Sequence, residues 1–351
     1  MNHDAETLIE GRAGPLAPPS RPVVEPGRAS GPALPLLAAL AALMIEPLHA
    51  QAPRYGGVGE DQWTGGSIIR MEGGTVIDED AVKTAREVAS HSTGTPEWTN
   101  PPGFEKDAFT LARVMFKSAD TSGKFINYGW GRGPRLGWWV DFPDADLNFS
   151  FRLQELTSIR TNPEGKVVRL NDADLTDYPL LYMEHPGYIN LRDSEVAALT
   201  KYLNNGGVVY VNDFWSQHDW EGFERQMRKV LPNKSWVELG TDHPIFHCVY
   251  EIKGPMQRLQ VPTMQFWNQD HKFEDPTSPP LQRVDRGEGS ETMHVRAWLD
   301  DKQRIMVIAF HNTDISDGWE REGENDAYFH TFSEKISYPL GINIVFYLMT
   351  H

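Results

Sequence analysis

Polar side chains that suit acid/base chemistry stand directly after three apolar segments, YPLLYM (Tyr178–Met183), GVVYV (Gly207–Val211) and RIMVIAF (Arg304–Phe310). These side chains are Glu184, His185, Asn212, Asp213, His311, Asn312 and Asp314. Carboxylates and imidazoles together can transfer protons, and the same groups can form an oxygen and nitrogen metal site. The alternative is a residual cleft in which these groups only satisfy strand ends and turns.

If the cluster is catalytic, we expect Asp213, His311 and Asp314 to do the chemistry. Glu184, His185, Asn212 and Asn312 would then bind the ligand. A carboxylate pair such as Asp213 with Glu184 or Asp314 would support glycoside hydrolysis only at the right separation, which sequence alone does not give.

A second group of histidines surrounds Pro244. His243 and His247 have the spacing of a zinc-binding helix, but the proline between them disfavours a regular helix. We therefore expect a turn that inserts Ile245 and Phe246 into the core, and no metal site is predicted. Cys248 is the only cysteine, which excludes an internal disulfide, and it is expected to be a small buried residue.

Tryptophan is abundant, and several tryptophans fall in expected loops: Trp130, Trp215, Trp220, Trp267 and Trp319. Exposed rings beside carboxylates would suit sugar binding, whereas buried rings would anchor the loops, and we favour burial. The segment Gly129–Pro134 is rich in glycine but lacks the lysine of a phosphate-binding loop. We expect a flexible loop near the strand ends.

The three apolar segments, together with Phe109–Phe116, predict strands that are buried on both faces. Helical spacing predicts four intervening helices, at Asn148–Ile159, Leu191–Leu203, Trp220–Leu231 and Ile336–Met349. Alternating strands and helices predict an α/β fold with a mostly parallel sheet covered by helices on both faces. A small antiparallel edge is expected from Val249–Ile252, Val261–Phe266 and Met293–Leu299.

The chain has 351 residues and a formal net charge of -16, with a sequence pI near 5.2. Such an acidic surface repels phosphate backbones and anionic lipids, so we expect no nucleic-acid partner.

The apolar run Ala33–Ile45 is shorter than a membrane span and precedes small residues that suit cleavage after Ala50 or Ala52. Residues 1–50 are thus expected to be a signal peptide, which makes the protein periplasmic or extracellular; an uncleaved anchor is the alternative. Residues 51–106 are expected to form an N-terminal extension with a helix at Asp78–Ser90, and residues 107–351 the α/β domain.

Four motifs occur in order along the chain: Trp138–Asp146, Leu156–Ile159, Gly206-Gly207 and Leu340–Asn343. Together they resemble the bacterial family called domain of unknown function 4159, over about Phe109 to His351. The resemblance implies a place in the class I glutamine amidotransferase-like superfamily, near the ThuA-like proteins, and a flavodoxin-like fold. It brings no activity with it.

Working members of that superfamily carry a nucleophilic cysteine on a tight turn after a central strand. Here Asp213 stands about where that cysteine would be, and Phe310–Asp314 resembles the later histidine motif. Cys248 lies in neither place. Without a thiolate on this turn, the usual covalent hydrolysis of glutamine is not expected.

Two functions remain open. The first is a non-catalytic module of the cell envelope that binds a small molecule, a carbohydrate or an envelope protein. The second is a hydrolase that acts on carbohydrate or a related envelope substrate. The sequence identifies no cofactor.

Overall fold

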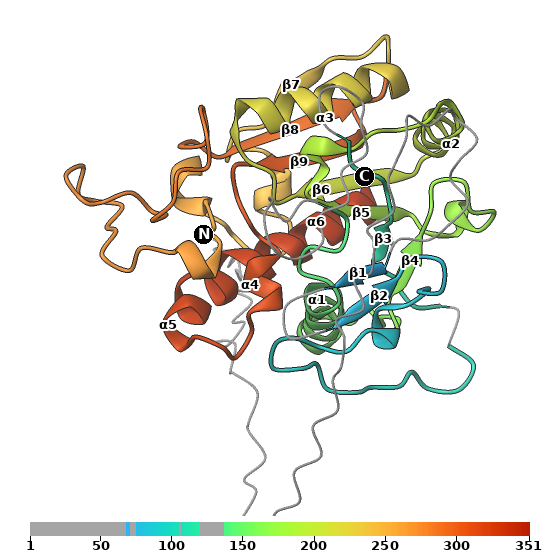
Figure 1. The fold of residues 1–351 in the computed structure, drawn as a ribbon, viewed down its shortest axis with the longest axis horizontal. Coiled ribbons are helices and arrows are strands. Elements are labelled where there is room, and N and C mark those ends of the chain that lie inside the picture. Colours follow the sequence, from blue (N-terminus) through green and yellow to red (C-terminus); the bar gives the residue numbers. More distant parts are fainter. Residues whose placement is uncertain (1–67, 71–74, 105–106, 120–136) are drawn as a thin grey trace, which may run out of the picture.

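The computed structural model describes residues 68–70, 75–104, 107–119 and 137–351 (Figure 1). The expected signal peptide in residues 1–50 and the glycine-rich segment Gly129–Pro134 lie outside the described residues.

Five of the seven strands of the main sheet are parallel and adjacent, in the order β4-β3-β5-β6-β9, with β4 at one edge. Their bounds are β3 Ala112–Val114, β4 Lys166–Val168, β5 Leu180–Glu184, β6 Val208–Asn212 and β9 Ile305–His311. Four of them confirm the predicted strands, because runs buried on both faces leave a clear apolar signal. Numbered along the chain, the parallel strands have the order 2-1-3-4-5, which is the flavodoxin-like order.

The antiparallel edge is formed by β7 (Trp236–Glu238) and β8 (His294–Leu299), which continue the sheet beyond β9. The predicted strand Met293–Leu299 is confirmed. The prediction of strands at Val249–Ile252 and Val261–Phe266 is wrong. Side chains instead of a neighbouring strand satisfy their backbone amides: Val249 N donates to Asn343 Oδ1 and Val261 N to Thr313 Oγ1.

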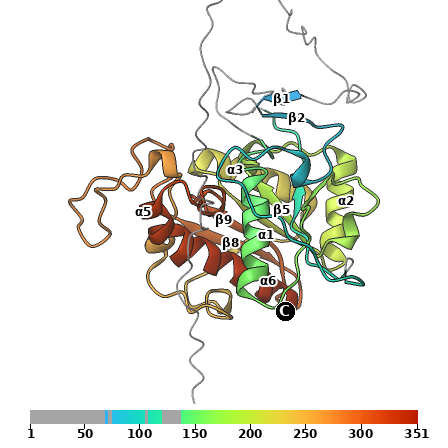
Figure 2. The ribbon, with the colours of Figure 1, turned by 90° about the horizontal axis from the view of Figure 1, so that it is seen from below.

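Helices cover both faces of the sheet (Figures 1 and 2). The helices are α1 Asp144–Leu156, α2 Asp193–Asn204, α3 Ser216–Val230, α4 Asp317–Glu320, α5 Asp326–Tyr328 and α6 Tyr338–Thr350. A π-helical segment, Phe329–Ser337, runs directly into α6. The four predicted helices correspond to α1, α2, α3 and α6, with ends displaced by a few residues.

Alternating side chains of each strand enter two separate cores. Tyr182 and Tyr210 face α1 and α6, and their rings stack with centroids 5.4 Å apart. The neighbouring residues Leu181 and Val209 face the opposite way, toward α2 and α3. The result is three layers, with the carboxyl ends of all five parallel strands at one edge.

The N-terminal extension packs on the domain without the helix expected at Asp78–Ser90, so that prediction is wrong. Two short strands, β1 (Ile68–Arg70) and β2 (Val76–Asp78), pair with each other, and only Ala85–Glu87 forms a 3-10 turn. The backbone of this segment bonds to another segment, since Ala85 N donates to Glu164 O and Val167 N donates to Lys83 O. In the described part of the chain, no helix has the length and apolar character needed to cross a membrane.

Candidate functional site

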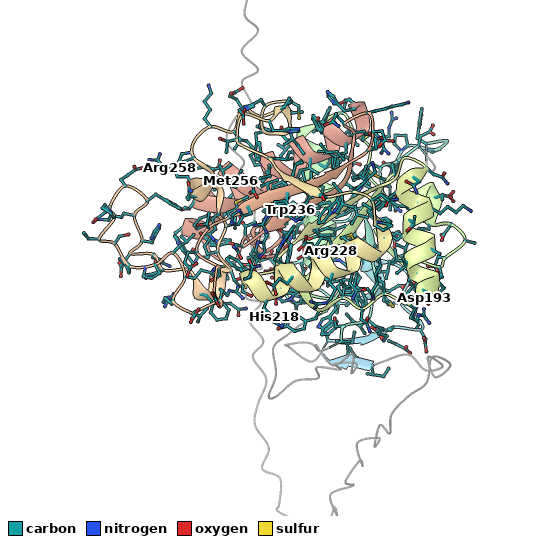
Figure 3. All side chains as sticks on the ribbon, turned by 90° about the horizontal axis from the view of Figure 1, so that it is seen from above. Asp193, His218, Arg228, Trp236, Met256 and Arg258 are labelled. Atoms are coloured by element: carbon teal, nitrogen blue, oxygen red, sulfur yellow. The ribbon has the colours of Figure 1, made fainter. Side chains whose placement is uncertain are left out.

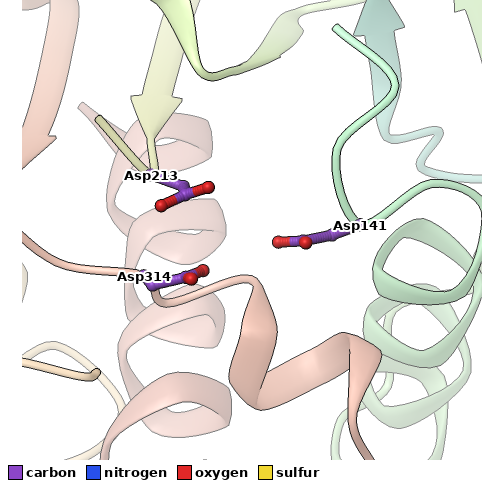
Figure 4. A group of neighbouring side chains, drawn as sticks. All are labelled: Asp141, Asp213 and Asp314. Atoms are coloured by element: carbon purple, nitrogen blue, oxygen red, sulfur yellow. The ribbon is translucent and has the colours of Figure 1, made fainter. Parts of the chain in front are cut away.

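Three aspartates from different parts of the chain meet at the carboxyl edge of the sheet (Figure 4). Asp213 follows β6 directly, Asp314 follows β9, and Asp141 lies just before α1. Each offers a carboxylate oxygen to a group whose members all lie within 4.8 Å of one another. The side chains point into a common space between the loops. We call Asp141, Asp213 and Asp314 the carboxylate triad.

Hydrogen bonds fix two members of the triad. Trp215 Nε1 donates to Asp213 Oδ1 over 2.8 Å. The hydroxyl of Thr263 donates to Asp314 Oδ2, and the backbone N–H of Asp317 donates to Asp314 Oδ1 at 3.0 Å. Oδ2 of Asp141 is buried and accepts no hydrogen bond. Asp141 therefore contributes to the triad a buried carboxylate oxygen without a hydrogen-bond partner among the described residues.

Glu184, at the end of β5, adds a fourth carboxyl group beside the triad. Its side chain is fully buried. Oε1 accepts a long hydrogen bond of 3.5 Å from Asn212, and Oε2 has no partner. This oxygen and Oδ2 of Asp141 are thus two buried oxygens of the site without a hydrogen-bond partner among the described residues, whereas most buried polar atoms have one.

The described chain places little positive charge beside the triad, where the charge of Arg321 only partly offsets that of Asp141. Among the described residues only His185 forms an ion pair with any of its members, with 3.7 Å between His185 Nε2 and Asp213 Oδ2. Burial, together with the nearby charges of Asp317 and Asp213, raises the pKa of Asp141 to about 8. Burial also raises the pKa of Asp314 and of Glu184 well above their ordinary values. Without a cation, these groups can fold together only if some of them hold protons.

A neighbouring group of carboxylates has a counter-charge from an arginine. Asp141, Asp317 and Glu320 also offer oxygens within 4.8 Å of one another. Here Arg321 supplies the counter-charge, with its Nε 2.7 Å from Glu320 Oε2 and 3.4 Å from Asp317 Oδ1. His91 Nδ1 lies 3.2 Å from Glu320 Oε1 as well. In this second group Arg321 pairs with Asp317 and Glu320. In the triad Asp213 pairs only with His185, and neither Asp141 nor Asp314 forms an ion pair with a described residue.

The backbone of the site is strained where the strands end. Asp141, His185 and Asp213 have φ angles of 59°, 54° and 49°, in the left-handed region that non-glycine residues rarely occupy. Each such residue costs on the order of 1–3 kcal/mol, and such residues concentrate at functional sites. His185 and Asp213 take this conformation directly after β5 and β6, and Asp141 takes it shortly before α1.

The structure brings together five of the seven side chains predicted from the sequence: Glu184, His185, Asn212, Asp213 and Asp314. Asn212 makes the link, because its Nδ2 donates to Ser316 Oγ at 2.8 Å and its Oδ1 accepts from Ile315 N at 3.3 Å. The loop after β9 is thereby tied to the end of β6.

His311 and Asn312 point elsewhere. His311 Nε2 is 2.9 Å from the carbonyl oxygen of Ser216, and its Nδ1 is 3.3 Å from Arg296 Nη1. Both ring nitrogens are thus occupied, and burial lowers the pKa of His311 to about 3. Asn312 holds loops together, donating from Nδ2 to the carbonyls of Gly289 and Thr292.

Three residues of the site were missed by the sequence analysis, namely Asp141, Asp317 and Glu320. Asp141 precedes a helix instead of following a strand, so the search for polar strand ends passed over it. Asp314, Asp317 and Glu320 recur every third residue within an otherwise apolar stretch. This spacing is the sequence signal that indicates Asp317 and Glu320.

The other polar candidates from the sequence do not join the site. His243 Nδ1 accepts from Ile245 N, and His247 Nε2 lies 2.7 Å from Thr241 O. Ile245 and Phe246 are buried as predicted. The prediction that Cys248 is buried is wrong: it is exposed, and its Sγ donates to Asn343 O at 3.2 Å. Partial burial raises the pKa of its thiol.

The predicted burial of the loop tryptophans is confirmed for all that the structure describes: Trp215, Trp220, Trp267 and Trp319. Trp130 lies outside the described residues. No aromatic face among these four is open to stack on a sugar, since none is more than 8% exposed.

The triad has the donor set of a hard divalent cation. Magnesium binds oxygens at about 2.0–2.1 Å and calcium at about 2.3–2.6 Å, so two oxygens on one ion are at most about 5 Å apart. The oxygens of the triad all lie within 4.8 Å of one another, which is close enough for one ion to contact all three. All three ligands are carboxylates and none is a thiolate or imidazole, which favours calcium, magnesium or manganese over zinc or copper.

Residues 125–349 match the family described as Domain of unknown function (DUF4159), which spans well over half of the chain. A comparison with curated proteins gave no match.

Proposed function

The chain belongs to the DUF4159 family, and we propose that it is a ligand-binding module of the cell envelope that holds a divalent cation between Asp141, Asp213 and Asp314. The observation that supports this most is the buried triad with no Lys or Arg paired to it in the described chain. Burying unpaired charge costs several kcal/mol per ion, and a bound cation would remove that cost.

The cation would also explain why the site is built as it is. Trp215 and Thr263 hold Asp213 and Asp314 in fixed orientations, as outer partners of metal ligands usually do. Oδ2 of Asp141 and Oε2 of Glu184 remain without partners. Glu184 is thus a candidate fourth oxygen ligand, directly or through water.

We further propose that the fold is a glutamine amidotransferase-like one in which an acidic residue replaces the nucleophile. Asp213 supports this, since it stands in a left-handed conformation on the turn between the central strand β6 and helix α3. Cys248 is distant in the chain, exposed and bonded to Asn343 O, so it offers no substitute. Binding without covalent catalysis is the function this arrangement favours.

A metal-assisted hydrolase is the second candidate. It is favoured by His185, whose buried Nδ1 has no partner and whose Nε2 faces Asp213. An imidazole beside a metal-bound water could accept its proton. The carbohydrate substrate considered from the sequence loses support, because the described loop tryptophans are buried.

Placement in the cell envelope rests on the apolar run Ala33–Ile45 and the small residues that follow it. Extracellular calcium modules have dissociation constants of about 10⁻⁴–10⁻³ M, so export and a carboxylate site of modest affinity suit each other. Fractionation of cells that express the tagged full-length chain would test this placement.

The proposed function is tested by thermal unfolding of the full chain after treatment with a chelator. Calcium, magnesium or manganese should raise Tm by several degrees, since a ligand at a hundred times its Kd adds about 2.7 kcal/mol. Asp141→Asn should abolish the shift. Asp301→Asn, which changes a fully exposed carboxylate, should preserve it. Equal shifts in wild type and Asp141→Asn would refute the site.

A further inference from the structure

A second cavity, of about 180 Å³, lies between α3 and the turn Pro186–Tyr188, near the same end of the molecule as the triad. Figure 3 labels His218 near the beginning of α3 and Arg228 near its end. Polar and basic side chains line the cavity: Tyr188, Asn190, His218, Arg225, Gln226 and Lys229. None of the described residues that line it is a carboxylate, although the chain carries a net charge of -16.

The floor of this cavity is rigid. Helix α3 approaches the turn so closely that a Cβ atom on Gly222 would lie 2.0 Å from the carbonyl oxygen of Gly187. Only glycine permits this contact. The helix is therefore fixed against the turn that follows His185, and the residues Arg225 and Lys229, one helical turn apart, project from the same face.

The polar groups around the cavity are arranged as donors. Gln226 is 6% exposed, and its Oε1 accepts from Leu191 N at 3.3 Å and from Lys229 Nζ at 3.0 Å. With Oε1 occupied, its amide nitrogen is left to donate. Arg225 makes no ion pair with any described residue, whereas its neighbour Arg228 is bound to Glu224 at 2.9 Å. The ring of His218 packs on Tyr188, with centroids 5.3 Å apart.

We propose that this cavity is a binding site for a tetrahedral oxyanion of the phosphate class, held by Arg225 and Lys229 with the amide of Gln226. Two cations and one amide donor on neighbouring positions of a single helix suit a doubly charged anion with several oxygens better than a singly charged carboxylate. The volume is below the range of about 300–1,000 Å³ usual for drug-sized ligands. It suits a phosphate group with few further atoms.

The test is calorimetric titration of the full chain with inorganic phosphate, methyl phosphate and acetate at low ionic strength. We expect phosphate or its monoester to bind at least tenfold more tightly than acetate. The double variant Arg225→Gln, Lys229→Gln should lose at least tenfold in affinity. Arg228→Gln changes charge on the same helix outside the cavity and should alter affinity less than twofold. Tighter binding of inorganic phosphate would indicate a site for the free ion, and tighter binding of methyl phosphate would indicate a site for a phosphate monoester.

The experiment can show the proposed anion site to be wrong independently of the proposed cation site. Asp141→Asn should leave phosphate binding unchanged, because Asp141 does not line the cavity. Arg225 and Lys229 are exposed, so their variants should fold, which circular dichroism would check. Phosphate binding that is absent in wild type, equal to that of acetate, or retained in the double variant would overturn the proposal.

Discussion

Asn212, the last residue of β6, donates from Nδ2 to Ser316 Oγ at 2.8 Å and so joins two strand ends that carry Asp213 and Asp314. The bond is buried and lies between residues far apart in the chain. It sets the separation of two of the three carboxylates of the triad. The relationship makes Asn212 a positioning residue for the site.

Asn212→Ala should therefore weaken cation binding without removing a ligand. We expect a loss of about 1–3 kcal/mol in unfolding free energy, because Ser316 Oγ and Ile315 N lose their partner in the interior. Cation affinity measured by titration should fall severalfold. The matched control is Asn171→Ala, which removes an exposed bond to Ser194 Oγ and should change neither quantity. Unchanged affinity in Asn212→Ala would show that the two strand ends hold their spacing without it.

The stability of the cation-free protein should decrease as pH rises. The pKa of Asp141 is raised from 3.8 to about 8, so the folded state binds a proton that the unfolded state releases. This contribution is complete below about pH 4 and is lost as pH rises toward 8. Asp314 and Glu184 act in the same direction.

Tm in chelator should consequently fall between pH 6.5 and pH 8, above the range in which His311 acts in the opposite direction, and saturating calcium should remove most of that decline. Asp141→Asn should flatten the profile even without calcium. If Tm in chelator rises steadily over this range in both wild type and variant, the inference that the buried carboxylates of the triad lack a counter-charge is wrong.

The predictable part of the fold is the part with a strong apolar signal. β5, β6 and β9 are buried along their whole length, so their runs were visible. β7 (Trp236–Glu238) was missed because it is short and largely exposed. Val261–Phe266 has apolar residues like a strand, but its first amide bonds a threonine side chain, which no periodicity reveals.

Only those site residues that follow a predicted strand could be located from the sequence. Asp213 and Asp314 follow central strands and were placed correctly. Asp141 belongs to the start of a helix, and its approach to the other two depends on how α1 packs on the sheet. His311 is the last residue of β9, yet its ring turns toward Arg296 and Ser216. Sequence spacing does not decide the side to which a strand-end residue turns.

Arg321 should be essential for stability in a way that exposed arginines are not. Its side chain is 15% exposed and pairs with both Asp317 and Glu320. Removing one partner of a buried ion pair costs about 3–5 kcal/mol. Arg321→Gln should show a loss of this order in denaturant unfolding. Arg228→Gln, with a side chain 72% exposed, should lose less than about 1 kcal/mol. Similar losses in both would mean that Arg321 does not neutralise the second carboxylate group.

His311 should remain neutral well below the pH at which an ordinary histidine is protonated. Its pKa is lowered from 6.5 to about 3, chiefly by burial, and the charge of Arg296 lowers it further. The folded state excludes a proton that the unfolded state accepts, so this contribution to stability is present above pH 6.5 and lost as pH falls toward 3.

Nitrogen chemical shifts of the His311 ring should report a neutral Nε2-protonated tautomer down to about pH 4. His218, whose side chain is 51% exposed, provides a comparison in the same spectrum. Protonation of His311 near pH 6.5 would place its ring in a different environment from the one described.

The central claim is most directly tested by the stoichiometry of cation binding. Chelator-treated full-length protein would be titrated calorimetrically with calcium, magnesium and manganese. The triad predicts saturable binding of one ion per chain for at least one of them, weakened at least tenfold in Asp141→Asn and Asp213→Asn and unchanged in Asp301→Asn. Absence of binding for all three ions, or equal binding by the Asp141 variant, would contradict a cation site at the carboxyl edge of the sheet.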